Sequence, residues 1–259
     1  MKKGIFYIII LAALLPFAAC KEDVPTVFAE PDGIYFSAPA DSMTYTFAKY
    51  PGRVIDTIKV PVTVLGKPSD KDRSIGIEKV SEAGINATEG VHYKLLQPYT
   101  LPAGKVSTLL PIVVYRTGDM DSLLISFKLQ LKGNENFISG ISTKTALKIK
   151  VGYLQKPSTW GEYTGFQWAG NSAEFGTWTK TKYKVILDAL YDPVSDTTVT
   201  EFPYLKSGAP VIYIQYLQLV RNYIRTKYPG NYSIPRGIGA TLRDPDFKDS
   251  VIQVGSANY

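Results

Sequence analysis

Alternation of apolar and polar residues dominates the chain between residues 33 and 152. In three segments, mostly apolar residues recur at every second position, and polar or charged residues fill many of the positions between them. Because successive side chains of a strand point to opposite faces, this period of two predicts antiparallel strands with one buried and one hydrated face. The three series are Ile58, Val60, Val62 and Val64; Leu123, Ile125, Phe127, Leu129 and Leu131; and Thr145, Leu147, Ile149 and Val151.

Clusters of turn-forming residues, such as those at 66–70 and 133–136, separate these runs. About seven short strands with this spacing are typical of an immunoglobulin-like antiparallel β-sandwich, which we place at residues 33–155. Pro61 has no backbone N–H to give to a sheet, so we expect its strand to lie at an edge or to carry a bulge there.

The pattern changes at residues 155–159, and we expect a smaller α+β domain over 156–259. Its alternating residues Tyr183, Val185 and Leu187 predict a strand. The fold class expected for the whole chain is therefore mainly β.

One amphipathic helix is expected in this second domain. Pro210 supplies a start and the pair Pro229-Gly230 a stop, and apolar residues recur between them at steps of three and four. Its last turn is basic, so the helix could lie on a membrane, but we expect its apolar stripe to pack on a sheet.

The first residues have the form of an export signal. A basic start at Lys2 and Lys3 precedes an uncharged apolar run, and two alanines then lead into Cys20. We expect residues 1–19 to be a signal peptide and Cys20, the single cysteine, to be the lipidation site of a bacterial lipoprotein. Several acyl chains on one residue hold a protein on a membrane stably. Residues 20–32 would then form a lipidated tether containing Pro25 and Pro31.

The tether begins with Lys21-Glu22-Asp23. This resembles the export signal of surface-exposed lipoproteins in the Bacteroidota, which implies an outer-membrane protein facing outside the cell. An ordinary hydrated linker also carries such charges.

Composition narrows the function classes. One Cys and one His exclude a disulfide framework and metal sites built from several cysteines or histidines. The formal charge of +6 becomes +4 once Lys2 and Lys3 are removed, and its dispersed lysines do not indicate a nucleic-acid partner. No motif of a nucleotide, metalloprotease or serine-hydrolase site occurs, so we expect no cofactor and no enzyme activity.

Aromatic residues gather just after the expected domain boundary. Indole faces between glycines can form a platform on which a sugar stacks, although aromatic side chains more often form a core. The candidate ligand-binding aromatics are Trp160, Tyr163, Trp168 and Trp178.

Acidic residues and the histidine offer weaker candidates. Asp244, Asp246 and Asp249 have a spacing that could reach a calcium ion, but a solvated hairpin turn accounts for it better. His92 is expected to have a structural role beside Tyr93. A glycosidase needs only two carboxyl groups, so a pair could be hidden among Glu162, Glu174, Asp188 and Asp192.

One segment resembles the Calx-β family. The matching residues are Ala87 to Tyr93, Leu101 to Lys105 and the strand beginning at Pro111. The resemblance implies a sandwich in which Tyr93 packs inward and Gly104 turns a hairpin. His92 stands where that family often has Asp, so the resemblance does not imply calcium binding.

The whole arrangement, ending in the segment from Phe175 to Tyr183, resembles a family of uncharacterised Bacteroidota lipoproteins known as a domain of unknown function, many of them encoded near glycan-uptake machinery. We therefore expect a lipid-anchored binding or accessory protein, with a glycan or another cell-surface protein as its ligand. A carboxylate-based hydrolase and a structural subunit of a surface assembly are the alternatives.

Overall fold

The computed structural model describes residues 32–157, 160, 175–200, 202 and 211–254, and the side chains of 211–214 are excepted. Expectations that fall on other residues, including the signal peptide, Cys20 and the tether to residue 31, lie outside this description. Among the described residues, no helix has both the length and the apolar character needed to cross a membrane.

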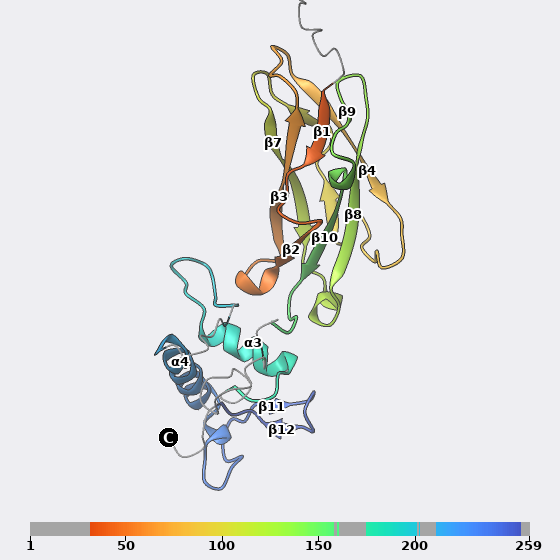
Figure 1. Ribbon diagram of the computed structural model, residues 1–259. Coiled ribbons are helices and arrows are strands. Elements are labelled where there is room, and N and C mark those ends of the chain that lie inside the picture. Colours follow the sequence, from red (N-terminus) through yellow and green to blue (C-terminus); the bar gives the residue numbers. More distant parts are fainter. Residues whose placement is uncertain (1–31, 158–159, 161–174, 201, 203–210, 255–259) are drawn as a thin grey trace, which may run out of the picture. The chain divides into compact units, whose positions relative to one another are not determined.

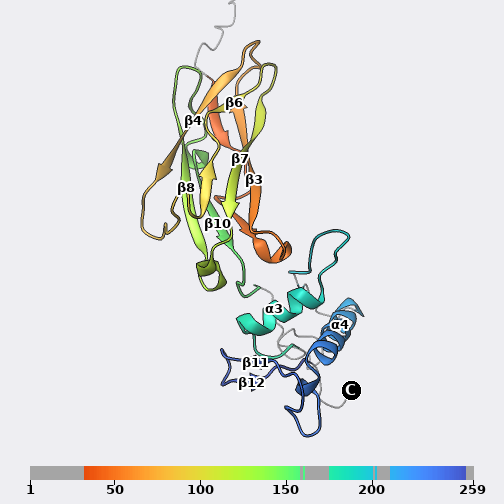
Figure 2. The same ribbon diagram turned by 180° about the vertical axis from the view of Figure 1, so that it is seen from behind.

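Two curled sheets of five strands each form a β-sandwich between residues 33 and 152 (Figures 1 and 2). The first sheet has the order β5 (Tyr93–Leu95), β7 (Ser107–Tyr115), β3 (Ile55–Leu65), β1 (Gly33–Phe36), β9 (Ile138–Ser139). The second has the order β2 (Ser42–Thr46), β10 (Ala146–Gly152), β8 (Ile125–Lys132), β4 (Arg73–Val80), β6 (Tyr99–Leu101). The ten strands exceed the expected number because several of them have only two or three residues.

The predicted alternation is confirmed within the three long strands that carry it, but Leu123, expected at the start of the second series, lies before β8 and is exposed. Every second residue of β3, β8 and β10 is buried between the sheets, while most of their neighbours are at least partly exposed. The aromatic centre of this core is Tyr93, which stacks on Phe127 with ring centroids 4.0 Å apart. The predicted inward position of Tyr93 is therefore confirmed.

The turn at Gly104 differs from the expected hairpin. Gly104 has a φ of +72°, and the Lys105 amide donates to the carbonyl of Pro102, which together describe a type II turn. However, this turn connects β6 and β7, which belong to different sheets. It is therefore a crossing between the sheets rather than a hairpin within one.

The first two strands switch sheets. β1 runs antiparallel to β3, and its register covers only the last four residues of β3, Val62–Leu65. The chain then leaves the first sheet, and β2 joins the edge of the second sheet parallel to β10. The earlier part of β3 consequently has a strand neighbour, β7, on one side only.

Pro61 lies within this arrangement in an unexpected place. β3 is an inner strand of its sheet, so the expectation of an edge strand was wrong for β3 as a whole. The Ser37 amide donates to the Pro61 carbonyl over 3.0 Å, which shows that the Pro61 nitrogen also faces β1. Pairing between β1 and β3 ends at Pro61. Its missing N–H therefore does not interrupt the series of hydrogen bonds between the two strands.

The described residues after 175 include two helices and a short hairpin: α3 (Lys180–Ala189), α4 (Val211–Lys227), β11 (Arg243–Asp244) and β12 (Ser250–Val251). The helix predicted between residues 210 and 229 is confirmed as α4. The predicted strand at Tyr183 was wrong, because that segment is helix α3. A second helix therefore joins the one expected, and the two contact each other.

Helix α3 has a clear local cause. Thr179 precedes it in an extended conformation, and its hydroxyl accepts a hydrogen bond from the Lys182 amide, as an N-cap does. Its buried residues are Tyr183, Val185, Ile186 and Leu187, and Tyr183, Ile186 and Leu187 together with the buried C-cap residue Leu190 follow helical spacing.

Candidate functional site

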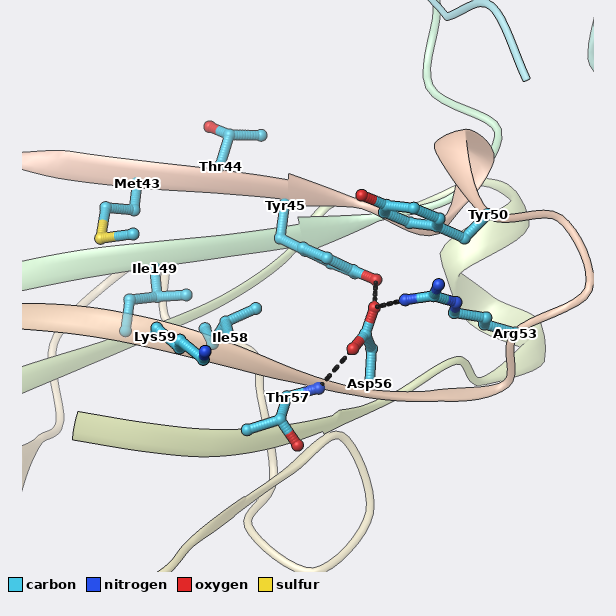
Figure 3. A pocket seen from close by; sticks show the side chains of 10 residues that line it. All are labelled: Met43, Thr44, Tyr45, Tyr50, Arg53, Asp56, Thr57, Ile58, Lys59 and Ile149. Atoms are coloured by element: carbon cyan, nitrogen blue, oxygen red, sulfur yellow. Dashed lines mark hydrogen bonds and ion pairs between the residues drawn. The ribbon is translucent and has the colours of Figure 1, made fainter. Parts of the chain in front are cut away.

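A groove opens on the side of the sandwich where the chain switches sheets. Its volume is about 330 Å³, and its walls come from β2 of the second sheet and the first part of β3 of the first sheet (Figure 3). The lining residues are Met43, Thr44, Tyr45, Tyr50, Arg53, Asp56, Thr57, Ile58, Lys59 and Ile149. Ile58 and Ile149 are buried core residues, and with the partly buried Met43 they form the apolar part of the lining.

A hydrogen bond joins the two walls. Tyr45 on β2 and Asp56 on β3 point toward each other, and the tyrosine hydroxyl donates to a carboxylate oxygen over 2.5 Å (Figure 3). The Arg53 guanidinium donates to the same oxygen over 3.1 Å, and the Thr57 amide donates to the other oxygen over 2.7 Å. Both oxygens of the Asp56 carboxylate are therefore engaged within the protein.

The pKa values of this pair follow from these contacts. The pKa of the Tyr45 hydroxyl is raised, first by burial and then by its bond to the carboxylate. Burial alone would raise the pKa of Asp56, but the hydrogen bonds from Tyr45, the Thr57 amide and Arg53 outweigh it and hold that pKa below its usual range. The carboxylate is thus held in its charged form.

Arg53 covers the neighbouring aromatic ring. Its guanidinium lies 4.2 Å from the ring centroid of Tyr50, within cation–π distance. Its Nε also contacts Asp196 at 3.1 Å. Arg53 is therefore fixed by two carboxylates and an aromatic ring.

Lys59 is the other cation of the lining and is exposed. Among the ion pairs formed by the described residues, none includes Lys59. Lys49, at the end of the short 3-10 turn Phe47–Lys49 beside Tyr50, is exposed as well. The Lys49 Nζ lies 5.8 Å from the Tyr50 ring centroid. Lys59 is thus the lysine of the lining that pairs with no described acid.

The tryptophans expected to form a platform have different environments. Trp160 is only 2% exposed, donates from Nε1 to the Gly176 carbonyl over 3.2 Å, and packs against Phe175, Tyr183 and Phe202. Its ring is buried in the core, which is the alternative to an exposed sugar-binding platform. Trp168 and Tyr163 lie outside the described residues.

Trp178 is partly buried and packs against the same core. Its Nε1 is buried and has no hydrogen-bond partner among the described residues. The structure therefore brings Trp160 and Trp178 to one core, with Tyr183 in contact with both.

His92 has both ring nitrogens engaged. Nδ1 accepts from the Thr88 amide over 2.8 Å, so the other nitrogen is left to face the Asp119 carboxylate, 3.1 Å away. The pKa of Asp119 is lowered, chiefly by the Thr117 hydroxyl and in smaller part by His92. His92 is 8% exposed and lies next to the stacked Tyr93, which is the structural role expected for it.

Asp244, Asp246 and Asp249 lie in the hairpin between β11 and β12. Asp244 is buried, and its two carboxylate oxygens accept from the Thr179 hydroxyl and the Asp246 amide. Within the described part of the chain, no three His, Cys, Asp or Glu residues form a group able to hold a metal ion. This segment therefore forms a hairpin in which the Asp244 carboxylate is held by donors of the protein itself.

The carboxylates considered for hydrolysis each have a local partner where they are described. Asp188 pairs with Lys184 one helical turn before it. Asp192 accepts from the Ser195 hydroxyl and the Val194 amide, which forms a tight turn. Glu162 and Glu174 lie outside the described residues.

Sequence reasoning did not select the residues of the groove. Met43, Tyr45 and Phe47 alternate in the sequence, and this was the available signal that Tyr45 belongs to a strand. This pattern does not show that Tyr45 contacts Asp56. The two residues lie in different sheets, and they come together only because the chain passes from the first sheet to the second between β1 and β2.

Comparison with known proteins gives a family but no established activity. The model of a family described as "Domain of unknown function (DUF4843)" matches residues 28–191. A search of curated proteins finds no match.

Solved structures from Bacteroides are similar to part of the chain, which spans half or less of their length. A two-domain protein of unknown function from Bacteroides fragilis NCTC 9343 is 13% identical, with a TM-score of 0.36 over 52% of this chain and 50% of that one. A protein of unknown function from Bacteroides ovatus is 17% identical, with a TM-score of 0.38 over 48% and 45%. A "putative carbohydrate binding protein" from Bacteroides ovatus ATCC 8483 is 8% identical, with a TM-score of 0.35 over 46% and 36%.

Proposed function

The chain belongs to the DUF4843 family, a domain of unknown function, and we propose that it is an exported, lipid-anchored binding protein of the outer membrane. The signal-like residues 1–19 and Cys20 support the anchor, and the charged residues after Cys20 support a position facing outside the cell. Its ligand is a glycan or another surface protein.

The single observation that carries the binding role is the groove between β2 and β3. It combines an apolar floor, a tyrosine–carboxylate pair held in place by an arginine, and a rim cation that pairs with no described acid. Concave sites with a few positioned polar groups above apolar side chains are the usual form of a ligand site. The groove therefore offers both contact area and orientation to a ligand.

The anchor is tested by labelling cells with an alkyne-tagged palmitate. The wild-type chain should be labelled and remain in the membrane fraction, whereas Cys20→Ser should lose the label and leave that fraction. Retention of label in Cys20→Ser would show that the acyl chain is elsewhere.

The binding role is tested in the same cells with a photo-crosslinking residue, benzoylphenylalanine. Placed at Thr57 in the groove, it should form a covalent adduct on illumination. Placed at the exposed Val91, beside β5 at the opposite edge of the first sheet, it should form none. Equal adduct formation at both positions, or none at Thr57, would contradict ligand binding in the groove.

The expected tryptophan platform is tested separately, by glycan binding of tryptophan variants. Because Trp160 is buried, Trp160→Ala is expected to disturb folding, and Trp178→Ala is the more informative change. Unaltered glycan-array binding by Trp178→Ala and by Trp168→Ala would remove the aromatic platform from the proposal.

A further inference from the structure

We propose that the ligand of the groove is an extended polypeptide segment of acidic character, which adds as a strand to the open edge of β3. This inference rests on the proposed binding function and specifies its ligand class. The juxtaposition that carries it is an unpaired strand edge, an apolar floor and an exposed lysine that pairs with no described acid, all in one groove.

The direction of the β3 backbone is the first step. The Pro61 carbonyl accepts from the Ser37 amide, so it faces the β1 side of the strand. Backbone groups of alternate residues in a strand face the same side, so the N–H and C=O of Lys59 and the C=O of Thr57 face that side too. The β1 register ends at Val62, and no strand of the described chain pairs with β3 there.

The register with β7 gives an independent check. Lys59 lies opposite Pro111, and Pro61 lies opposite Leu109. A proline has no N–H to donate, so the Lys59–Pro111 pair cannot exchange the two hydrogen bonds of a closely bonded pair. This agrees with Lys59 directing its backbone groups away from β7 and toward the groove side.

The edge has defined ends. The Thr57 N–H is already used, because it donates to the Asp56 carboxylate. Pro61 closes the other end because it offers no donor. A short segment of strand, centred on Lys59, is therefore what the edge can accept.

The side chains around the edge favour a peptide over a sugar. A sugar site commonly needs a free aromatic face and carboxylate oxygens with spare acceptor capacity. In this groove, Arg53 lies over Tyr50, and the Asp56 carboxylate already accepts three hydrogen bonds, two on one oxygen and one on the other. An added strand needs neither, because its main affinity comes from main-chain hydrogen bonds.

The floor of the groove suits a strand. Successive side chains of an added strand point alternately inward and outward. Inward side chains would meet Ile58, Ile149 and Met43, so they should be apolar.

The positive charge of the groove favours an acidic segment over other extended polypeptides. The lining has Arg53 and Lys59 against the single acid Asp56, and Arg53 is already paired with Asp56 and Asp196. Lys59 remains for the ligand, and the exposed Lys49 lies over the lining residue Tyr50, with Nζ 5.8 Å from the ring centroid. A second copy of this chain, adding through its own β3, would bring the same cations together, so an acidic segment of another protein fits better.

The test uses the full lipidated chain in detergent micelles and a phage-displayed library of random 12-residue peptides. We expect enriched peptides to alternate apolar with polar residues and to contain Asp or Glu. Their affinity should fall as salt rises, because attraction between exposed charges is screened. A synthetic copy of the most enriched peptide is then titrated against variants.

Two substitutions of one residue separate the backbone from the side chain. Lys59→Pro removes the edge N–H and should weaken peptide binding by about tenfold or more, in keeping with the loss of a main-chain hydrogen bond and of the charge. Lys59→Ala keeps the N–H and should weaken it by only a few-fold, roughly the effect of one exposed charge. Equal effects of both variants would overturn strand addition, because a ligand held by the side chain alone loses the same contact in each.

Hydrogen exchange provides a readout that does not depend on the folding of Lys59→Pro. In the wild-type chain, bound peptide should slow the exchange of the Lys59 amide and leave the exposed Val91 amide unchanged. An unprotected Lys59 amide in the saturated complex would overturn the proposal.

The photo-crosslink at Thr57 distinguishes failure of this inference from failure of the proposed function. Mass spectrometry of the adduct should identify a peptide rich in Asp and Glu. A glycan adduct, or an adduct with the β3 segment of a second copy, would overturn acidic strand addition while the binding function stands. No adduct at all would remove both.

Discussion

At the scale of the residue, the bond between Tyr45 and Asp56 holds together two strands that belong to different sheets. Tyr45→Phe removes the hydroxyl and keeps the ring, which lies edge-on to Phe47. We expect the free energy of unfolding, measured with urea, to fall by about 1–2 kcal/mol, since a charged acceptor loses one of its donors. Tyr35→Phe on β1 is the matched control, because the Tyr35 hydroxyl takes part in no hydrogen bond among the described side chains, and it should change stability little.

The lowered pKa of Asp56 predicts a pH dependence of stability. A carboxyl group whose pKa is lower in the folded state stabilises the fold above its unfolded pKa of about 3.9, and this contribution is lost as the pH falls through the folded pKa. Urea titrations at pH 7 and pH 3 should therefore show a larger loss of stability for the wild type than for Asp56→Asn. The same pH dependence in both proteins would show that the Asp56 carboxyl is not stabilised by folding.

His92 is expected to matter for stability rather than for chemistry. His92→Ala leaves the Thr88 amide without its acceptor and opens space beside Tyr93, so the free energy of unfolding should fall by about 1–3 kcal/mol. Val91→Ala, at the exposed neighbouring position, should have a much smaller effect. A loss of ligand binding in His92→Ala at full stability would instead give His92 a functional role.

At the scale of the element, helix α3 depends on its N-cap. The Thr179 hydroxyl accepts from the Lys182 amide and donates to the buried Asp244 carboxylate over 2.5 Å. Thr179→Ala should cost about 1–2 kcal/mol in urea unfolding and should reduce helical circular dichroism, whereas Thr179→Ser keeps the hydroxyl and should lose less. Equal stability of the two variants would show that the methyl group, not the cap, matters at this position.

The same helix shows what the sequence could and could not predict. Long alternating runs of apolar and polar residues predicted β3, β8 and β10 correctly, because each of these strands buries one face against the opposite sheet. Tyr183, Val185 and Leu187 also alternate, yet they lie in α3. The helical signal was present in Tyr183, Ile186, Leu187 and Leu190 at steps of three, one and three, together with the N-cap threonine, and a short apolar run satisfies both periods.

The groove could not be predicted from local patterns for a different reason. Its walls come from residues 43–45 and 50–59, which meet only because β1 leaves the first sheet after four residues and β2 enters the second. Nothing in the periodicity of either strand specifies the sheet it joins. The anion–tyrosine pair at the mouth of the groove is therefore a product of topology, whereas the core beneath it follows from the alternation.

At the scale of the whole molecule, the parallel pairing of β2 with β10 has a mechanical consequence. The proposed lipid anchor lies before residue 32, so a load on the anchored chain would enter through β1 and β2. Pulling residues 32 and 152 apart draws parallel strands past each other, and all of their hydrogen bonds share the load. Pulling residues 132 and 146 apart would instead peel the antiparallel pair β8 and β10 from one end, bond by bond. Optical-tweezers measurements on the same protein should show a higher rupture force for the first pair of attachment points. A load that enters at the tether and leaves beyond residue 152 would then be borne by all the hydrogen bonds between β2 and β10 at once.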